Sequence, residues 1–316
     1  MSAATPYVRP DVKMLLDMLA AMGGPKMNEI PLADARASYV QMAALVEADP
    51  VPLATIKDLS CPGPRGDIPL RLYDARAERA PGPVVMFYHG GGFVIGDLDS
   101  HHALCTTIAA ELDLPVVAVH YALAPEHPFP ASDEDSIAAT RWVAENGAAL
   151  GREATGLITM GDSAGGHLAI VVAQDLANAP AKVPVILQVP IYPATDESSD
   201  GSMAEFAEGF LLTKETMDWF MACYAPVPGD PRAYPIHGDQ AGSPPTLLVT
   251  ASLDPLRDQG RRYAAALAAA GVECHFMEMK GSIHGFVNLR KAVPSAQADM
   301  LAILAQAKLM LGRICA

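Results

Sequence analysis

The chain has 316 residues, of which 51% are hydrophobic and 18% charged, and its formal net charge is −14. A chain of this length and composition can bury a large core, so we expect one large α/β domain with a small accessory part. The negative charge disfavours binding to nucleic acid or to an anionic membrane surface, and we expect neither partner.

The five cysteines are scattered along the chain, and no C-x-x-C pair occurs among them. This pattern argues against a disulfide framework and a structural zinc site, and it predicts a reducing, cytoplasmic location. The opening stretch MSAATPYVRPDVK contains two prolines and several charges before any apolar run, so we expect no signal peptide. We also expect no membrane span, because no run reaches the roughly 18 apolar residues that a spanning helix needs.

Residues 1–50 are predicted to be helical and to form the N-terminal part of a cap. Met14, Met18 and Met22 recur at every fourth position, which predicts one apolar face on a helix. A second helix is predicted over Leu32–Glu47. An apolar face usually packs against the rest of a fold, but flexible methionines can also line a substrate pocket. We assign Met14 and Met18 to such a pocket.

Short apolar runs separated by turn residues begin at Thr55. Thr55–Ser60 and Ile68–Tyr73 flank a Pro- and Gly-rich turn and predict an antiparallel hairpin. Later runs alternate with helical patterns, which predicts a mostly parallel, doubly wound sheet with its functional residues at the carboxyl ends of the strands. The further strands are expected at Val84–Tyr88, Val116–His120, Leu157–Met160, Val185–Ile191, Thr246–Ala251 and Cys274–Met279.

The alternation is interrupted in residues 194–225, which we interpret as an excursion from the sheet that completes the cap. A helix is predicted over Lys214–Tyr224, with Thr213 as its N-cap. Phe210 and Leu211, which precede this helix, are candidate walls of an apolar pocket. The expected division of the chain is therefore a cap of residues 1–50 and 194–225 and an α/β domain of residues 51–193 and 226–316.

The stretch Gly156–Ala173 joins two apolar runs through the sequence GDSAG. This matches the G-x-S-x-G pattern, in which a strained turn between a strand and a helix exposes a serine hydroxyl. Such a pattern also occurs by chance in Gly-rich loops, but the apolar runs on both sides favour the catalytic interpretation. We predict that Ser163 is a nucleophile and that Asp162 holds the turn through backbone hydrogen bonds.

A serine nucleophile needs a general base and a third group that orients the base, in the chain order serine, acid, histidine. Asp254 lies just after a predicted strand, whereas Asp258 is better placed to begin the next helix, where a carboxylate favours the positive end of the helix dipole. His284 lies in a Gly-containing loop after the following strand. We predict Asp254 as the acid and His284 as the base, against the alternative that His284 is an ordinary surface-loop histidine.

An HGGGF sequence follows the strand predicted over Val84–Tyr88. Loops of this type supply backbone N–H groups to the oxyanion that forms in acyl transfer. Gly91 and Gly92 are the predicted donors, together with Ala164, whose N–H lies at the start of the helix after the nucleophile. Phe93 is a candidate pocket wall.

A metal hydrolase built on histidines is an alternative to the serine mechanism. His89, His101 and His102 are close in sequence, but no H-E-x-x-H or comparable ligand spacing is present. We therefore predict neither a metal nor an organic cofactor.

Taken together, the chain resembles the hormone-sensitive-lipase-like esterases, which are the family IV lipolytic enzymes of the α/β-hydrolase superfamily. The resemblance covers nearly the whole chain. It implies a sheet of about eight strands with a helical cap, a carboxylester hydrolase without a cofactor, and a preference for short- to medium-chain acyl esters. It also implies a Ser163, Asp254, His284 triad with Gly91, Gly92 and Ala164 as oxyanion hole. The matching sequences are HGGGFVIGDLDSHH, YALAPEHPFPA, GDSAGG, YP, DPLRD and HGF.

Two positions depart from the family pattern. Ala122 stands where the Tyr-x-Leu-Ala-Pro-Glu sequence usually has arginine, and Gln259 stands where a glutamate is usual. The resemblance implies that these changes affect an ion pair, local stability and the docking of the cap, but not the chemistry.

Other functions remain open at this stage. An amidase or lactonase would use the same triad. A non-catalytic ligand-binding protein on the same fold, like the gibberellin receptor, is also possible, although that receptor lacks the catalytic histidine and this chain has His284. We expect a small-molecule ester as the partner and a monomer or homodimer as the assembly.

Overall fold

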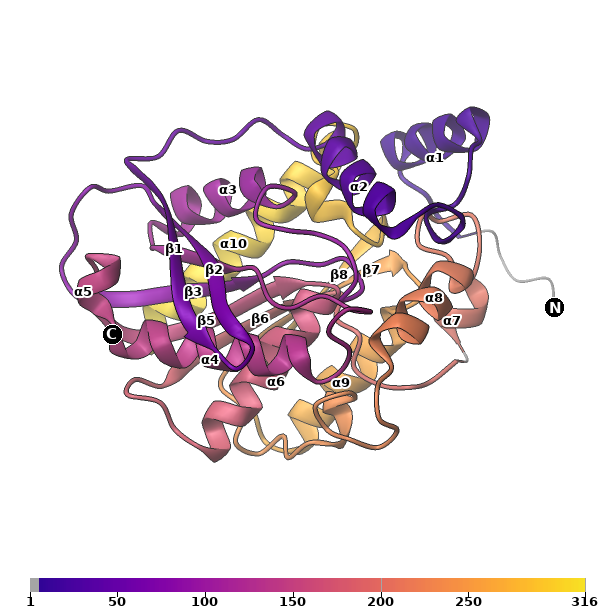
Figure 1. Cartoon of the computed structure of the whole chain (residues 1–316). Coiled ribbons are helices and arrows are strands. Elements are labelled where there is room, and N and C mark those ends of the chain that lie inside the picture. Colours follow the sequence, from indigo (N-terminus) through magenta and orange to yellow (C-terminus); the bar gives the residue numbers. More distant parts are fainter. Residues whose placement is uncertain (1–5, 200, 316) are drawn as a thin grey trace.

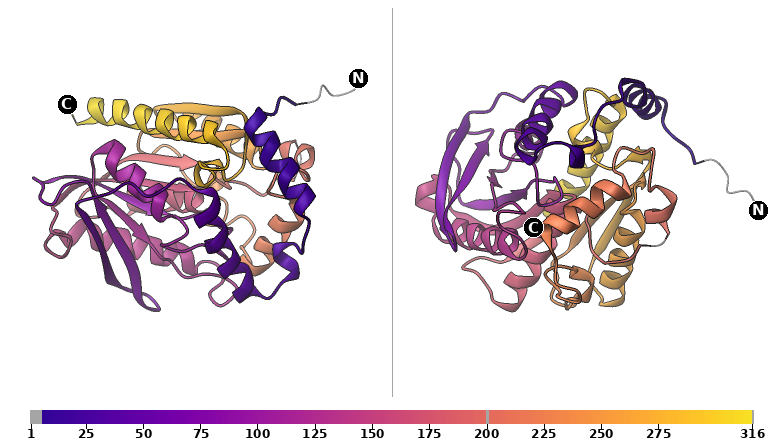
Figure 2. Two further views of the ribbon diagram at one scale, coloured as in Figure 1. Left: turned by 90° about the horizontal axis from the view of Figure 1, so that it is seen from above. Right: turned by 45° about the vertical axis from the view of Figure 1, so that its right-hand side comes forward.

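The computed structural model describes residues 6–199 and 201–315. Within them, eight strands form one sheet, and helices lie on both of its faces (Figures 1 and 2). The strands are β1 (Thr55–Gly63), β2 (Gly66–Asp74), β3 (Gly82–Tyr88), β4 (Val116–Val119), β5 (Ala154–Asp162), β6 (Val185–Ile191), β7 (Thr246–Leu253) and β8 (Cys274–Ile283).

The strand order across the sheet is β1-β2-β4-β3-β5-β6-β7-β8. β1 pairs antiparallel with β2, β2 pairs antiparallel with β4, and all other neighbours in the sheet are parallel. These pairings confirm the predicted hairpin and the predicted mostly parallel sheet. The parallel strands are apolar on both faces because helices cover both faces.

Two groups of helices bury these faces. Leu104 and Met300 belong to a core on one side of the sheet, which includes α3 (His102–Leu112) and α10 (Pro294–Ile314). Val143 and Leu168 belong to the core on the other side, formed with α4 (Ala131–Glu145) and α6 (Ala164–Asn178). The remaining helices of these layers are α5 (Gly147–Leu150) and α9 (Arg257–Ala269).

Further helices gather at one end of the molecule (Figure 1). Thr213 accepts a hydrogen bond from the Thr216 N–H (3.2 Å), so the predicted N-cap is confirmed. Met27 and Tyr39 pack with Phe220, which joins the N-terminal segment to residues of the excursion. These elements are α1 (Pro10–Met22), η1 (Met27–Glu29), α2 (Leu32–Val46), α7 (Ser202–Glu205) and α8 (Lys214–Tyr224); a short turn, η2 (Pro235–His237), follows α8, and η3 (Phe286–Asn288) follows β8.

Three strands extend further towards their carboxyl ends than their apolar runs predict. The ladder continues through Asp162 in β5, and Leu253 of β7 pairs with Ile283 of β8. Backbone hydrogen bonding therefore extends these strands beyond the ends of the apolar runs predicted from the sequence. As a result, the residues predicted to form a triad are each the first residue after a strand.

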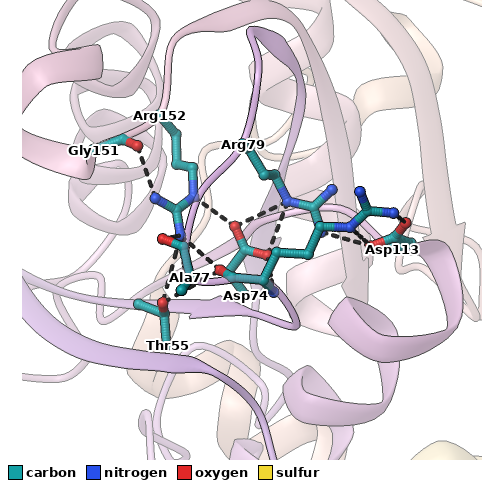
Figure 3. A network of polar contacts seen from close by, with 8 residues as sticks. Thr55, Asp74, Ala77, Arg79, Asp113, Gly151 and Arg152 are labelled. Carbon is teal, nitrogen blue, oxygen red and sulfur yellow. Dashed lines mark hydrogen bonds and ion pairs between the residues drawn. The ribbon is translucent and has the colours of Figure 1, made fainter.

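The opposite end of the sheet carries a buried polar network, which we call the Asp74 network (Figure 3). Asp74, the last residue of β2, is completely buried and accepts hydrogen bonds from Arg79 Nε (2.9 Å) and Arg152 Nε (2.6 Å). Arg152 also donates to the carbonyl oxygens of Ala77 (3.1 Å) and Gly151 (2.7 Å). This network connects the end of β2 to the residues that precede β5.

No helix within residues 6–199 and 201–315 has the length and apolar character needed to cross a membrane.

Candidate active site

The turn between β5 and α6 holds Ser163 in an unusual backbone conformation, with φ +55° and ψ −118°. Only glycine fits two positions before and two positions after this serine. A Cβ atom on Gly165 would lie 1.9 Å from the Tyr88 carbonyl oxygen, and one on Gly161 would lie 2.4 Å from the same atom. The glycines thus allow the turn to approach β3 closely, and the strain falls on the serine that the turn displays.

Ser163, His284 and Asp254 form a continuous hydrogen-bonded series. Ser163 Oγ lies 2.8 Å from His284 Nε2, and His284 Nδ1 lies 2.7 Å from Asp254 Oδ2. Asp254 is completely buried, and its second oxygen accepts from the Leu256 N–H (2.8 Å). The Tyr192 ring packs on His284 with centroids 4.6 Å apart. The structure therefore brings together the three residues that the sequence places in three separate loops.

Asp258, the alternative acid, has a different environment. Its Oδ2 accepts from the Ser202 N–H (2.9 Å), and its carboxylate pairs with Arg257 and Arg261. Burial raises the pKa of Asp258, but the hydrogen bonds from Arg257 and Ser202 and the charges of Arg257 and Arg261 outweigh it and bring the pKa to about 2. Asp258 lies in the first turn of α9, where the sequence placed it, and ties this helix to α7.

The Gly loop after β3 lies beside Ser163 at the cavity. Gly91 and Gly92 have φ values of +119° and +59°, and a Cβ atom on Gly92 would lie 2.3 Å from the Phe220 ring. Among the described residues, none accepts a hydrogen bond from the N–H of Gly91, Gly92 or Ala164. These three N–H groups are thus available to a bound molecule.

Asp162 differs from its predicted role. Its Oδ1 accepts from the Gly90 N–H (2.9 Å), which belongs to the loop after β3 and not to the turn that contains Asp162. The expectation that Asp162 holds its own turn is therefore corrected. Its carboxylate ties the Gly loop to the end of β5, because these neighbouring parallel strands end at the same edge.

A cavity of about 350 Å³ lies over Ser163 and His284. Phe93 and Leu211 line it, as the sequence predicted. Most of its other walls are apolar and come from the N-terminal segment, from α8 and the residues just before it, and from the loop after β3. They include Met27, Met42, Ile95, Leu212, Met217, Phe220 and Met221.

Three predicted pocket residues lie elsewhere. Met14 and Met18 are 72% and 47% exposed, because α1 turns Val12 and Leu15 towards the protein and leaves the methionine face in solvent. Phe210 packs edge-on against Phe206, with ring centroids 5.1 Å apart, and is not among the residues that line the cavity. The methionine lining is supplied instead by other methionines of the same N-terminal segment and by α8.

Two structural details explain how the chain accommodates its departures from the family pattern. Ala122 donates its backbone N–H to Asp135 (2.9 Å), and Arg65, from the turn between β1 and β2, supplies the ion pair to Asp135 (2.5 Å). Gln259 Oε1 accepts from the N–H groups of Thr195 (3.0 Å) and Asp196 (3.3 Å). The neutral Gln259 side chain thus holds the backbone of Thr195 and Asp196 at the start of residues 194–225.

The histidines near the Gly loop are packed together without a ligand arrangement. His89 and His101 have ring centroids 5.6 Å apart. Burial lowers the pKa of His89 well below its ordinary value, and the charges of His101 and His120 lower it further. Within the residues that the structure describes, no group of three His, Cys, Asp or Glu side chains is arranged to hold a metal ion.

Phe220, Met27 and Met42 were not singled out from the sequence, and Tyr192 was noted only as part of the YP match, without a role at the site. Tyr192 is the first residue after β6, so its position at a strand end was a usable signal. The other three are apolar residues on helices, and no local pattern distinguishes them from ordinary core residues.

Known proteins share this architecture and this sequence. A family model described as the alpha/beta hydrolase fold matches residues 85–288. The chain is 43% identical over 272 residues to the carboxylic ester hydrolase LipN of Mycobacterium tuberculosis, covering 81% of this chain and 71% of that protein. It is 36% identical over 286 residues to the ethyl acetate hydrolase of Pseudomonas putida, covering 88% of this chain and 90% of that protein.

A solved structure extends the similarity to three dimensions. The ester-hydrolase EH1AB1 from the metagenome of Lake Arreo superposes with a TM-score of 0.91 at 38% identity, over 96% of this chain and 99% of that chain. These relatives confirm the prediction of a serine carboxylesterase. The chain belongs to the hormone-sensitive-lipase-like carboxylesterases of the α/β-hydrolase fold.

Proposed function

We propose that this carboxylesterase hydrolyses short- to medium-chain acyl esters, with Ser163 as nucleophile, His284 as general base and Asp254 as the orienting acid. The observation that carries the proposal is the series Ser163 Oγ–His284 Nε2 (2.8 Å) and His284 Nδ1–Asp254 Oδ2 (2.7 Å) beneath an apolar cavity. A serine hydroxyl within hydrogen-bond distance of an oriented imidazole is an activated nucleophile.

Acylation is the first half of the reaction. Ser163 Oγ attacks the ester carbonyl carbon while its proton passes to His284 Nε2, and the carbonyl oxygen becomes an oxyanion. The N–H groups of Gly91, Gly92 and Ala164 stabilise this charge. The intermediate collapses as His284 protonates the leaving alcohol, which leaves the acyl group bound to Ser163.

Deacylation repeats these steps with water. His284 takes a proton from a water molecule that attacks the acyl carbonyl carbon. The oxyanion formed in this step accepts hydrogen bonds from the same three N–H groups. Collapse breaks the bond to Ser163 Oγ, returns the proton to that oxygen and releases the carboxylic acid. Asp254 keeps the proton of the neutral imidazole on Nδ1 and stabilises the imidazolium formed in each step.

The cavity supports a compact acyl group as the preferred substrate. Its volume is about 350 Å³, and Met217, Phe220 and Leu211 form part of its walls. We assign residues 1–50 and 194–225, of which 1–5 and 200 lie outside the described residues, to a cap that closes the cavity, because Met27 and Tyr39 pack on Phe220. We further propose a monomer or homodimer in the cytoplasm. The location is supported by the cysteines of the described chain, all of which are free thiols.

A series of p-nitrophenyl esters of increasing acyl length tests the proposal. We expect kcat/KM to fall beyond medium-length chains, and a serine-directed organophosphate to abolish turnover by modifying Ser163. Matched amide and lactone substrates, which the same triad can attack, should react more slowly. If the amide or the lactone reacted faster than the ester, the ester would no longer be the assigned substrate class.

A further inference from the structure

A cluster of buried polar groups lies beside the nucleophile, next to the triad but separate from it. The Asp162 carboxylate is 2% exposed. Its Oδ1 accepts from the Gly90 N–H at 2.9 Å, and its Oδ2 lies 3.5 Å from Asn288 Nδ2. Asp162 is adjacent to Ser163 in the chain, so the orientation of its side chain bears directly on the site.

His101 and Asn288 complete this cluster from distant parts of the chain. Asn288 Nδ2 donates to His101 Nε2 (2.9 Å), and the Gly90 N–H also points towards this nitrogen (3.3 Å). His101 Nδ1 lies 3.0 Å from Ser100 Oγ, so its proton has a partner on the other side of the ring. An amide nitrogen carries two hydrogens, and Asn288 therefore bridges two acceptors, His101 and Asp162.

The cluster connects three loops that must act together. Gly90 precedes the proposed oxyanion donors, Asp162 precedes the nucleophile, and Asn288 lies four residues after His284 in η3. His101 and Asn288 are 1% and 8% exposed, so water does not compete freely for these contacts. Loops that pack through buried hydrogen bonds have one strongly preferred arrangement, and here the Asn288 Nδ2 group makes these bonds while its Oδ1 has no partner among the described residues.

The Gly loop is sensitive to the position of Asp162. A Cβ atom on Gly90 would lie 2.4 Å from Asp162 Oδ2, which shows how closely the carboxylate and the loop approach. Donors to an oxyanion act within a narrow range of distances, and small displacements of catalytic groups have large effects on rate. A rotation of the Asp162 carboxylate would therefore displace the N–H groups of Gly91 and Gly92.

We propose that Asn288, together with His101, is a positioning residue for the oxyanion hole. Asn288 holds the Asp162 carboxylate in the orientation that accepts from Gly90, and this keeps the Gly91 N–H directed at the substrate carbonyl. His101, whose Nε2 lies 3.2 Å from Asp162 Oδ1, accepts from Asn288 and thereby orients its amide. The inference rests on the proposed function, because it takes Gly91 and Gly92 as oxyanion donors. Neither Asn288 nor His101 touches the substrate.

The variant Asn288→Asp tests the proposal with little change of shape. It replaces the bridging donor with an oxygen that faces two acceptors, Asp162 and His101. We expect kcat to fall by about tenfold or more while KM changes by less than about threefold. The control is Asn146→Asp, because Asn146 Nδ2 also donates a hydrogen bond, to the Trp142 carbonyl oxygen (2.8 Å), at the far end of α4.

A transition-state analogue separates positioning from a general loss of structure. When a trifluoromethyl ketone binds, Ser163 Oγ adds to its carbonyl carbon, the hydroxyl proton passes to His284 and the carbonyl oxygen becomes an oxyanion. We expect its inhibition constant to rise in Asn288→Asp by the factor that kcat falls. The inhibition constant of the matching secondary alcohol, which forms no oxyanion, should remain unchanged. Asn288→Ala introduces no new oxygen and should show the same pattern. It takes the place of Asn288→Asp in this experiment if Asn288→Asp does not fold.

Two results would overturn the positioning proposal. One is an unchanged inhibition constant for the ketone in both Asn288 variants. The other is an equal loss of affinity for ketone and alcohol, because this would mean a general loosening of the site. Failure of the proposed function is distinguishable from both, since Ser163→Ala would then keep the esterase activity of the wild type.

Discussion

Two buried carboxylates at opposite ends of the same sheet have different partners and different consequences. Asp74 accepts from the guanidinium groups of Arg79 and Arg152, and these are held in turn by backbone carbonyl oxygens and Asp113 (Figure 3). Asp254 faces a single imidazole, that of His284, whose other nitrogen meets a hydroxyl group at the cavity. In the first arrangement the partners of Asp74 are themselves bonded to other protein groups. In the second, the last group of the series is the Ser163 hydroxyl, which faces the cavity.

The partner of a buried carboxylate decides whether the pair is only structural or also reactive. A guanidinium keeps its proton under all ordinary conditions and forms several fixed hydrogen bonds, so it immobilises a carboxylate. An imidazole exchanges a proton near neutral pH, so a carboxylate that orients it prepares it for transfer. β5 connects the two ends, because it follows Arg152 and leads directly to Ser163. Changes at one end should therefore affect stability, and changes at the other should affect chemistry.

The largest effect is expected for Ser163→Ala. Loss of the proposed nucleophile should lower kcat by about 10⁵- to 10⁶-fold, while the thermal unfolding midpoint stays near that of the wild type. Alanine and serine suffer similar strain at φ +55°, which is why stability should not change much. Assays with a p-nitrophenyl ester and thermal unfolding monitored by circular dichroism measure both quantities. Near-normal activity would remove Ser163 from the mechanism.

Asp74→Ala should have the opposite signature. It leaves the guanidinium groups of Arg79 and Arg152 without their shared carboxylate in a buried site, and we expect a loss of about 3–5 kcal/mol in the free energy of unfolding. At urea concentrations where Asp74→Ala is still folded, its kcat/KM should stay within about twofold of that of the wild type. Asp58→Ala is a matched control, because its pair with Arg71 has a 69% exposed carboxylate and such pairs contribute about 0–1 kcal/mol.

Urea unfolding and ester hydrolysis can be followed on the same preparations of these variants. A large fall in kcat/KM for folded Asp74→Ala would contradict the separation of the two ends. An equal loss of stability in Asp58→Ala would show that burial does not distinguish the two carboxylates.

Gly92→Ala should lower kcat by about 10²- to 10³-fold, because it disturbs one of the proposed oxyanion donors. The added Cβ atom would meet the Phe220 ring at 2.3 Å in a conformation with φ +59°. KM for a short ester should rise by less than kcat falls, because the Phe220 ring that must shift is one of several cavity walls. Steady-state kinetics with acetyl and butyryl esters measure the two constants. A higher KM with an unchanged kcat would mean that the loop binds substrate but does not stabilise the oxyanion.

The pH dependence of stability provides the smallest of these effects. Burial holds the pKa of His89 well below its ordinary value. Below about pH 6.5 the unfolded chain therefore binds a proton at this residue, whereas the folded chain does not. The free energy of unfolding should then fall as the pH drops below 6.5, by at most about 1.4 kcal/mol per pH unit from this residue.

The variant His89→Asn should reduce that slope. Denaturant unfolding at several pH values between 7 and 5 gives the slope for the wild type and the variant. Equal slopes would mean that other groups account for the whole pH dependence in this range. The comparison isolates His89, which lies at the active-site end of the sheet.

The chain order and the strand ends made the core of the site predictable from sequence. Ser163, Asp254 and His284 each follow an apolar run, and carboxyl ends of parallel strands meet at one edge of a sheet. The Gly loop was predictable for the same reason. The fold class followed from the alternation of apolar runs and helical patterns, which a parallel sheet requires.

The cavity walls could not be predicted in the same way. The spacing of Met14 and Met18 predicts an apolar face on a helix, but it does not determine whether that face meets the protein or the solvent. Phe220 and Met42 line the cavity because their helices dock over the sheet, and docking depends on contacts between distant segments. Asn288 was overlooked because a lone asparagine near a histidine loop carries no local pattern.

The exposed face of α1 has a chemical consequence for the molecule. Met14, Met18 and Met22 are 72%, 47% and 73% exposed, and peroxides oxidise accessible thioethers to sulfoxides. The methionines of the cavity are better shielded, since Met27, Met42, Met217 and Met221 are only partly exposed. Mild oxidation should therefore add oxygen to α1 first, and the protein should gain mass before it loses activity.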